Sequence, residues 1–396
     1  MVPELRGRFN RAFTADRYRA MRAGLEARCG GPIEFRLSET PCFLPGSVAR
    51  ALVGVSQALV AQLVDSADYL RAAESVVPPE LRLPRGEARP TFIQVDFGLI
   101  RTDGGIEGRL VEMQAFPSLY GFQLLLADAV RGAWDCEGLS LFFGGLTRQA
   151  YIELVRQAIV GTHDPAEVVA LEIEPERQKT RPDFAATEAL WGVRAVDLRS
   201  IERQGRRVFV RDGHRRMPVR RFYNRVIPDE LARRGLTWPF DLRDDLDVEW
   251  TGGPDWYCRM SKFALPWLDH PWVPRTRPLS DAAGLPSNRE AWVLKPLLSF
   301  AGGGIIFAPT DEDLAAIPAS DRDRFVVQER VAFTPLIETP HGPTQVEVRV
   351  MLVNTVTGYQ AVIPLGRMGR GLMMGVDHNK GLEWVGATAV LIDERS

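Results

Sequence analysis

The stretch Ala291–Phe307, AWVLKPLLSFAGGGIIF, is typical of an apolar strand, a glycine-rich loop and a second apolar strand. Glycines let backbone N–H groups approach phosphate oxygens closely, and Lys295 adds a compact cation on the first strand. Lys295 precedes the glycines, so the stretch is neither a Walker A loop nor a strand–GxGxxG–helix dinucleotide motif. We predict that it cradles nucleotide phosphates; the alternative is a glycine hairpin with a chance lysine. The predicted phosphate-binding residues here are Lys295, Gly302, Gly303 and Gly304.

The composition is that of an ordinary globular chain. It has 396 residues, 45% hydrophobic and 25% charged, and a formal net charge of −2. The length is enough for about two or three domains. The balanced charge argues against a general nucleic-acid binder. No uninterrupted apolar run reaches the roughly 20 residues of a membrane span, and the N-terminus lacks an apolar signal segment. We therefore expect a cytoplasmic protein with no nucleic-acid or membrane partner.

Cysteine, histidine and lysine usage narrows the chemistry further. The four cysteines are scattered, which favours reduced thiols, and the five histidines form no pair with metal-binding spacing. Only four of the 49 basic residues are lysines. Lysine ends in a compact ammonium group, whereas arginine ends in a planar guanidinium group. The few lysines retained in so arginine-rich a chain are therefore candidates for positions that need an ammonium group. Two of the four are Lys262 and Lys295.

The pattern of apolar and polar residues divides the chain into four regions and predicts a mixed α/β protein. Residues 1–90 show helical apolar spacing, and residues 91–165 begin with two strand-like runs joined by a turn. Residues 166–250 look like a small α/β unit. Residues 251–396 hold the glycine loop and several more strands. The arginine-rich segment 206–221 is either a solvated hairpin edge or an anion-binding surface, and the sequence leaves its role open.

Two upstream strands carry candidate metal ligands. Glu112 and Gln114 are two residues apart on a strand, so their side chains project from one face. Asp96 lies on the preceding strand and can join them. If a nucleotide is bound, a magnesium ion is expected with it, because a cation neutralises phosphate oxygens.

The order of these motifs resembles that of the circularly permuted ATP-grasp ligases. Gln94-Val95-Asp96 and Glu112-Met113-Gln114 look like the RxD and ExN motifs of glutathionylspermidine synthase and its relatives, with the eukaryotic-type glutathione synthetases more distant. The segment 256–268, WYCRMSKFALPWL, resembles the tryptophan and SNKALLPLLW of that family. The resemblance covers roughly residues 90–390. It implies an ATP-grasp fold with a permuted motif order, an additional small pre-ATP-grasp α/β domain at 166–250, and ATP-binding lobes within 251–396.

The resemblance also implies roles for individual residues. It makes Lys262 a second phosphate-binding lysine, and it makes FVVQERV, residues 325–331, the hinge that contacts adenine and ribose. Arg349 or Arg367 would hold the γ-phosphate as the catalytic arginine, although an ordinary ion pair between Glu347 and Arg349 is an equal alternative. The implied hinge residues are Gln328, Glu329, Arg330 and Val331, and the implied magnesium ligands are Asp96, Glu112 and Gln114.

This chain departs from the family pattern at three places. Gln94 stands where the family has an arginine that stabilises the acyl phosphate, and Arg101 is the candidate to replace it. Gln114 replaces asparagine, which keeps an amide oxygen on a longer side chain. The loop LLSFAGGG is apolar and lacks the acidic ligand of the glutathione synthetases. There is also no cysteine amidase domain, so hydrolysis of an amide product is not expected.

Together these observations predict an ATP-dependent carboxylate–amine ligase. A small-molecule carboxylate would be activated as an acyl phosphate and captured by an amine, with ATP and Mg²⁺ as cofactors. Two alternatives remain: a degenerate nucleotide-binding module without ligase activity, and an ATP-dependent phosphotransferase. The sequence identifies neither the acid nor the amine, and it does not give the oligomeric state, because acceptor pockets are built from variable loops.

Overall fold

A six-stranded mixed sheet forms the centre of the molecule. The computed structural model describes residues 1–281, 287–299, 302–375, 379 and 381–396. The strand order is β1–β17–β16–β15–β2–β3, in which β1 and β17 are parallel and all other neighbours are antiparallel. These strands span Cys42–Pro45 (β1), Phe92–Thr102 (β2), Gly105–Gln114 (β3), Gln345–Thr355 (β15), Gly358–Gly369 (β16) and Gly386–Asp393 (β17).

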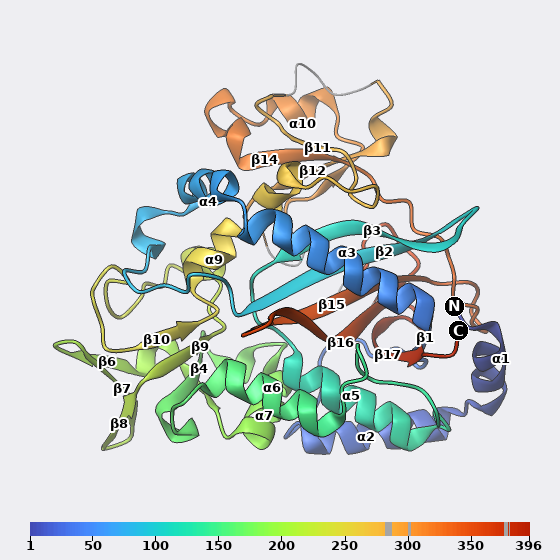
Figure 1. Cartoon of the computed structure of the whole chain (residues 1–396), viewed down its shortest axis with the longest axis horizontal. Helices are drawn as coiled ribbons and strands as arrows, with labels where there is room; N and C mark the ends of the chain where they lie inside the picture. Colours follow the sequence, from blue (N-terminus) through green and yellow to red (C-terminus); the bar gives the residue numbers. More distant parts are fainter. Residues whose placement is uncertain (282–286, 300–301, 376–378, 380) are drawn as a thin grey trace.

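Helices cover both faces of this sheet (Figure 1). α3 crosses one face, and α2, α5 and α6 lie against the other, where α7 packs behind α5. The mixed α/β class predicted from the sequence is therefore confirmed. The helices span Pro3–Ala12 (α1), Ala15–Arg28 (α2), Gly46–Val64 (α3), Ala67–Ala73 (α4), Tyr120–Ala133 (α5), Arg148–Val160 (α6), Arg181–Trp191 (α7), Pro228–Arg233 (α8), Pro254–Arg259 (α9) and Asp311–Ala315 (α10).

Three smaller sheets surround the central one. A parallel sheet has the order β10–β9–β4–β5, an antiparallel sheet has the order β11–β14–β12–β13, and β6–β7–β8 form an antiparallel three-stranded sheet. The β11–β14 sheet lies above the central sheet in Figure 1. These strands span Val168–Glu172 (β4), Arg194–Asp197 (β5), Ile201–Gln204 (β6), Arg207–Asp212 (β7), Arg215–Val219 (β8), Arg221–Asn224 (β9), Glu249–Thr251 (β10), Thr276–Pro278 (β11), Trp292–Pro296 (β12), Ile306–Phe307 (β13) and Phe325–Glu329 (β14).

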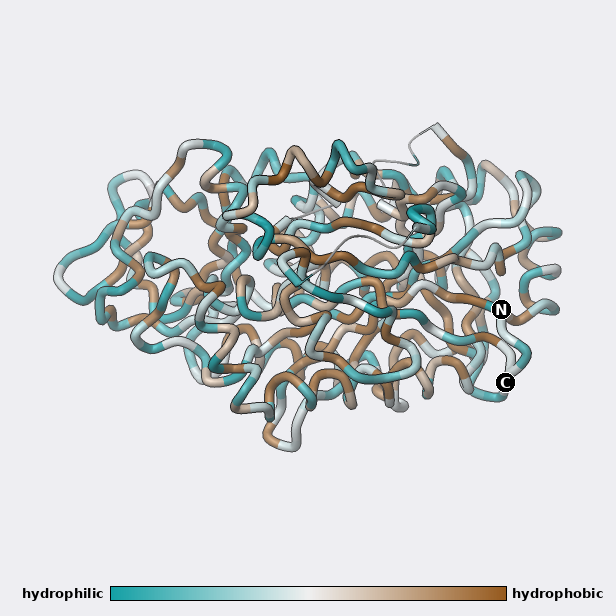
Figure 2. Tube along the Cα trace, turned by 90° about the horizontal axis from the view of Figure 1, so that it is seen from above, coloured by the Kyte–Doolittle hydropathy of each residue, from teal (hydrophilic) through white to brown (hydrophobic). Residues whose placement is uncertain are grey.

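The two ends of the chain meet at one side of the central sheet (Figures 1 and 2). Residues 1–90 form α1 to α4 and also contribute β1, which pairs with β17 near the C-terminus. The backbone N–H of Val2 donates to Phe43 O at 3.3 Å, and that of Ser47 donates to Ser396 O at 2.9 Å. The N-terminal region therefore completes the central sheet as well as covering it.

Strand alternation divides β15 between the two cores. Val348 and Val350 pack in the cluster that includes α3, whereas Met351 and Val353 pack in the cluster that includes α2, α5 and α6. Successive side chains point to opposite faces, so Arg349 shares the face of Met351 and Val353. On this one face the sheet thus changes from apolar, beneath the helices, to charged, beyond them.

Helix α3 is long and apolar enough to cross a membrane by length and composition alone. Its buried residues, Leu52, Leu59 and Leu63 among them, pack against the sheet in the same cluster as Val348 and Val350. This contact accounts for its apolar character as that of a core helix.

The arginine-rich segment forms a hairpin whose charges are paired at the surface. Arg206 forms ion pairs with Asp245 and Asp247, and Arg211 and Arg216 both pair with Glu202. Figure 2 shows this end of the molecule as largely hydrophilic. These contacts match the solvated hairpin edge, one of the two interpretations left open by the sequence.

A buried carboxylate holds the start of α5. Asp183 Oδ1 accepts the backbone N–H groups of Gly121 (3.0 Å) and Phe122 (2.9 Å), and Oδ2 accepts that of Leu119 (2.9 Å). Arg225 Nη1 also donates to Asp183 Oδ2 at 2.6 Å, and both side chains are fully enclosed. One side chain therefore caps the helix N-terminus and neutralises a buried arginine.

Replacing Asp183 tests how much its carboxylate contributes to the free energy of unfolding. We expect Asp183→Asn to lower the free energy of unfolding by about 3–5 kcal/mol, because it leaves the Arg225 charge buried without a partner. Asp128→Asn, which removes surface pairs with Arg28 and Arg148, is the matched control and should cost about 0–1 kcal/mol. Chemical denaturation followed by circular dichroism measures both; equal losses would contradict the assignment.

Candidate functional site

A cavity of about 310 Å³ lies between the central sheet and the β11–β14 sheet. Most of the residues predicted to form the site line it. Four do not: Lys262, Gly303, Gly304 and Glu329 are absent from its wall. The predicted residues that line it are Asp96, Glu112, Gln114, Lys295, Gly302, Gln328, Arg330, Val331, Arg349 and Arg367.

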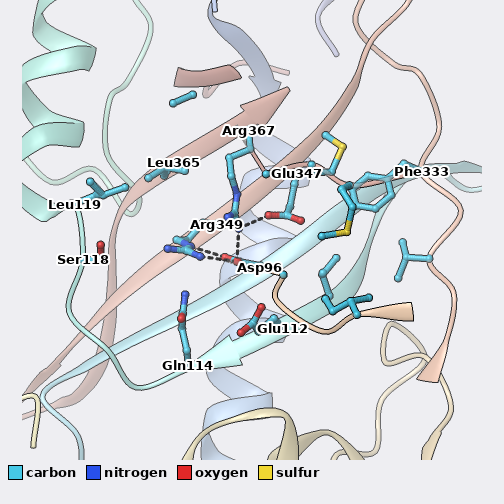
Figure 3. Close-up of a pocket in the computed structure, with 18 of the residues that line it drawn as sticks. Asp96, Glu112, Gln114, Ser118, Leu119, Phe333, Glu347, Arg349, Leu365 and Arg367 are labelled. Atoms are coloured by element: carbon cyan, nitrogen blue, oxygen red, sulfur yellow. Dashed lines mark hydrogen bonds and ion pairs between the residues drawn. The ribbon is translucent and has the colours of Figure 1, made fainter. Parts of the chain in front are cut away.

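A charged cluster occupies the floor of the cavity (Figure 3). Arg349 donates from Nε to Asp96 Oδ1 at 2.6 Å and from Nη2 to Asp96 Oδ2 at 2.7 Å. Arg367, on the next strand, contacts Asp96 Oδ2 and Glu347 Oε1. The cluster thus joins three adjacent strands, β2, β15 and β16, on one face of the sheet.

Charge pairing sets the protonation of the cluster. Burial raises the pKa of Asp96, but Arg349 and Arg367 outweigh this effect and hold the pKa below its usual value. Burial raises the pKa of Glu347, and the nearby Arg367 only partly offsets it. Arg367 Nε has no hydrogen-bond partner among the described residues, although the atom is buried. Arg367 also lines the cavity, which places its guanidinium group beside any anion that binds there.

Gln94 is a junction of this network. Its Oε1 accepts Arg349 Nη1 at 2.6 Å and Gln114 Nε2 at 3.1 Å, and its Nε2 donates to Ser118 O at 2.7 Å. A guanidinium group therefore does contact this position, namely that of Arg349 on the neighbouring strand. Arg101, the candidate replacement, is exposed and does not line the cavity.

Lys295 lies on the opposite side of the cavity, on β12. Its Nζ donates to Gln328 Oε1 at 2.6 Å and to Val111 O at 3.1 Å. Burial lowers the pKa of Lys295 to about 8. Gln328 Nε2 has no partner among the described residues. Lys295 and Gln328 thus present polar groups within an otherwise apolar wall formed by Val293, Ile305, Phe307, Val331 and Phe333.

Lys262 is not among the residues that line the cavity. It is buried, donates to Ser299 O at 3.0 Å and lies 3.4 Å from Glu112 Oε1. In this arrangement it connects β3 to the beginning of the glycine loop, behind the cavity wall.

Two glycines of the loop require their residue type. Gly302 and Gly304 have φ angles of 78° and 71°, which side chains of L-residues rarely adopt. A Cβ on Gly302 would lie 2.3 Å from Met373 Cε, so the loop approaches the segment around Met373 closely. Residues 300 and 301 of the loop lie outside the described residues.

The hinge segment places only part of its predicted residues in the cavity. The Glu329 carboxylate lies 3.3 Å from Arg275 on the exposed side, and Glu329 does not line the cavity. Arg330 and Val331 do line the cavity. Beyond them Phe333 packs over the central sheet at Gly98, where a Cβ would lie 2.6 Å from the Phe333 ring.

The predicted magnesium ligands do not all fit that role. The described residues contain no group of three or more His, Cys, Asp or Glu side chains arranged to hold a metal ion. Asp96 instead accepts arginine donors on both of its carboxylate oxygens. Glu112 and Gln114 face the cavity side by side on β3 (Figure 3), which fits the one or two protein oxygens that Mg²⁺ takes beside nucleotide phosphates.

Comparison with known proteins supports the fold. No protein-family model matches the chain, and no curated protein matches it in sequence. The chain shares its fold with a glutathione synthetase-like effector. That protein, from Globodera pallida and solved in apo form, aligns with a TM-score of 0.58 and 11% identity over 95% of this chain and 96% of its own. At this identity the match shows a shared fold and nothing finer.

The structure adds residues that sequence reasoning did not place in the site. Glu347 was weighed only as a partner of Arg349, yet its contact is with Arg367. The alternation in VEVRV, residues 346–350, puts both charged side chains on one face and is the signal that marks the pair. Gln123 and Phe333 carried no such signal, because their neighbours come from distant segments.

The lowered pKa of Lys295 gives a pH test. Between about pH 8 and 10.5 the unfolded chain binds more protons at this lysine than the folded chain does, so folding stability rises with pH in this window. We expect the unfolding free energy of the wild type to rise relative to that of Lys295→Met, by up to about 3 kcal/mol. Denaturant titrations at pH 7.5 and 10.5 measure the difference. A constant difference would contradict the lowered pKa.

Proposed function

We propose that this protein is an ATP-dependent carboxylate–amine ligase. The fold is that of a glutathione synthetase-like protein, and the motif order in the sequence resembles the ATP-grasp ligases. The observation that carries the proposal is one cavity that unites Lys295 and Gln328 on an apolar wall with Arg367, whose Nε is unpaired, on the opposite floor. Such a cavity suits a nucleotide at the apolar wall and a transferred phosphoryl group beside the arginine.

The proposed reaction has two steps. An oxygen of the substrate carboxylate attacks the γ-phosphorus of ATP, and ADP leaves, which gives an acyl phosphate. The nitrogen of a neutral amine then attacks the acyl carbon, inorganic phosphate leaves, and the nitrogen loses one proton to water or to the leaving phosphate, which gives the amide. The protein contributes positioning and charge neutralisation: Lys295 holds nucleotide phosphates, and Arg367 holds the phosphoryl group as it transfers.

A magnesium ion would enter with the nucleotide. Glu112 and Gln114 are the residues that would hold it, and it would neutralise charge on the phosphate oxygens. Asp96 has another part in this proposal. Its carboxylate contacts both Arg349 and Arg367 and so holds the two guanidinium groups at the cavity.

The finer family relation is also part of the proposal. The order in which β2 and β3 precede the glycine loop supports a circularly permuted ligase of the glutathionylspermidine synthase type. In this scheme residues 166–250, which hold the parallel β10–β9–β4–β5 sheet, serve as the pre-ATP-grasp domain.

One observation favours the alternative of a nucleotide-binding module without ligase activity. The full engagement of Asp96 by two arginines leaves the cavity with fewer free carboxylate oxygens than the resemblance implies. The two functions differ in turnover, and one assay separates them.

The test is a screen for stimulated ADP release. Purified protein with ATP and Mg²⁺ is incubated with matrices of carboxylic acids and amines, and products are identified by mass spectrometry. Amide formation with one ADP per product is expected. Magnesium-dependent ATP binding without ADP release across the matrix would favour the binding module, and phosphate on a hydroxyl substrate would favour a phosphotransferase. No ATP binding at all would reject every one of these functions.

Lys295→Met tests the site assignment. We expect ATP-dependent turnover to fall at least about 100-fold, because the variant loses the cation at the phosphates while keeping a side chain of similar volume. Arg71→Met, at an exposed position of α4, is the control and should retain wild-type turnover. Undiminished turnover of a folded Lys295→Met protein would refute the cradle.

A further inference from the structure

Among the described residues that line the cavity, one carboxylate has no part in the proposed reaction. Asp96 accepts arginine donors on both of its oxygens, and Glu112 is proposed to hold magnesium. The remaining carboxylate of the cavity wall is that of Glu347, on β15. Burying a carboxylate costs desolvation free energy, so its place beside the proposed phosphoryl site calls for a reason.

The strand register gives Glu347 a cation on one side only. Arg367 lies directly opposite it on β16, whereas Gly98, which has no side chain, lies opposite it on β2. Phe333 and Val331 cover this glycine, where a Cβ would lie 2.6 Å and 3.0 Å from their side chains. Toward β2, therefore, Glu347 has an apolar cover and not a second cation.

The two oxygens of Glu347 have different surroundings. Oε1 contacts Arg367 and is enclosed by the protein. No described residue donates a hydrogen bond to Oε2, and Oε2 is not among the enclosed side-chain atoms that lack a partner. Because Glu347 lines the cavity, Oε2 is the oxygen that the cavity reaches. Figure 3 shows it pointing away from Arg367.

These surroundings make Glu347 a stronger base than Asp96. Burial raises the pKa of Glu347, and Arg367 only partly offsets this effect. The pKa of Asp96 is lowered instead. Two carboxylates whose pKa values move in opposite directions suit different roles, and the one with the raised pKa accepts a proton more readily. The charged groups that act on Glu347 are Arg367 on β16, Asp96 on β2, Arg349 on β15, Glu112 on β3 and Lys295 on β12.

The second step of the proposed reaction needs a base. Most aliphatic amines carry an extra proton near neutral pH, and an ammonium nitrogen has no electron pair with which to attack. In the proposed function Arg367 holds the phosphoryl group, which one oxygen joins to the acyl carbon. The Glu347 carboxylate is paired with that same arginine, which holds Oε2 near the place where the amine must arrive.

We propose that Glu347 is the general base that prepares the amine for attack. Oε2 takes one proton from the ammonium group, the N–H bond breaks, and the nitrogen keeps the electron pair. The neutral nitrogen attacks the acyl carbon, the bond from that carbon to the phosphate oxygen breaks, and a second proton passes from nitrogen to the leaving phosphate. Glu347 then gives its proton to water. This assignment rests on the proposed ligase function.

Hydroxylamine separates the base from the rest of the site. It is a neutral nucleophile near neutral pH, so its attack on an acyl phosphate, which gives a hydroxamate, needs no prior loss of a proton. The full-length protein is incubated with ATP, Mg²⁺ and mixtures of amino acids, dicarboxylic acids and short peptides. One series contains hydroxylamine, and the other contains the amine found in the ADP screen. Mass spectrometry quantifies ADP, hydroxamate and amide.

Glu347→Gln keeps the shape of the side chain and removes the base. We expect amide formation to fall at least about 100-fold and hydroxamate formation to stay within about threefold of wild type. Retained hydroxamate formation also shows that the variant is folded. The loss of amide formation should narrow as the pH rises toward the pKa of the amine, because free amine needs no base. Glu188→Gln, at an exposed position of α7, is the matched control and should keep both activities.

A structural role for Glu347 predicts a different pattern. Equal losses with the amine and with hydroxylamine, or an amide deficit that does not change with pH, would overturn the assignment. Glu347→Asp keeps a carboxylate and should form amide faster than Glu347→Gln. Equal amide rates in these two variants would also overturn it.

The wild-type protein distinguishes this proposal from the function beneath it. If it forms neither amide nor hydroxamate with any acid, the ligase function fails, and the base role fails with it. If wild type and Glu347→Gln form both products at the same rates, the ligase function stands and the base role is wrong.

Discussion

The carboxylate of Asp96, held by Arg349 and Arg367, is the interaction on which the site depends. Burying a single charge at this position would cost a large desolvation free energy. Here the negative charge of Asp96 and the positive charges of the two arginines offset this cost for one another. The three residues come from three neighbouring strands, so the network also fixes which side chains stand together on the charged face of the sheet. The lowered pKa of Asp96 shows that the arginines outweigh the burial of this acid.

From that network the cavity divides into two chemically different halves. Toward the β11–β14 sheet the wall is apolar around the buried pair Lys295 and Gln328. Toward α5 aromatic residues line it, and Gln123 Oε1 is buried there without a hydrogen-bond partner among the residues that the structure describes. In the proposed reaction this division would hold a nucleotide and an acid on either side of the transferred phosphoryl group.

Sequence reasoning placed much of this site and missed the parts that depend on pairing. The sequence predicted the strand that carries Lys295 and the shared face of Glu112 and Gln114, because both features depend on residues close together in the sequence. Asp96 was assigned to a metal since its type and strand allow it; its arginine partner lies 253 residues away. Lys262 contacts Ser299, and Glu329 contacts Arg275. These partners are also distant in the sequence, so the sequence did not indicate which contacts the two side chains make.

The sequence by itself determined the mixed α/β class and the strand alternation of the central sheet, and it named the residues that we propose to bind phosphate. These features are local: side-chain period, glycine conformation and the cost of a lysine on an apolar strand act within a short stretch of chain. The tertiary structure alone decided that Arg349 holds Asp96, that the charged face opens into a cavity, and that Gln123 keeps a free oxygen. Those outcomes depend on contacts between segments distant in the chain, and the free energy of a buried charge or amide is set by whatever those segments bring beside it.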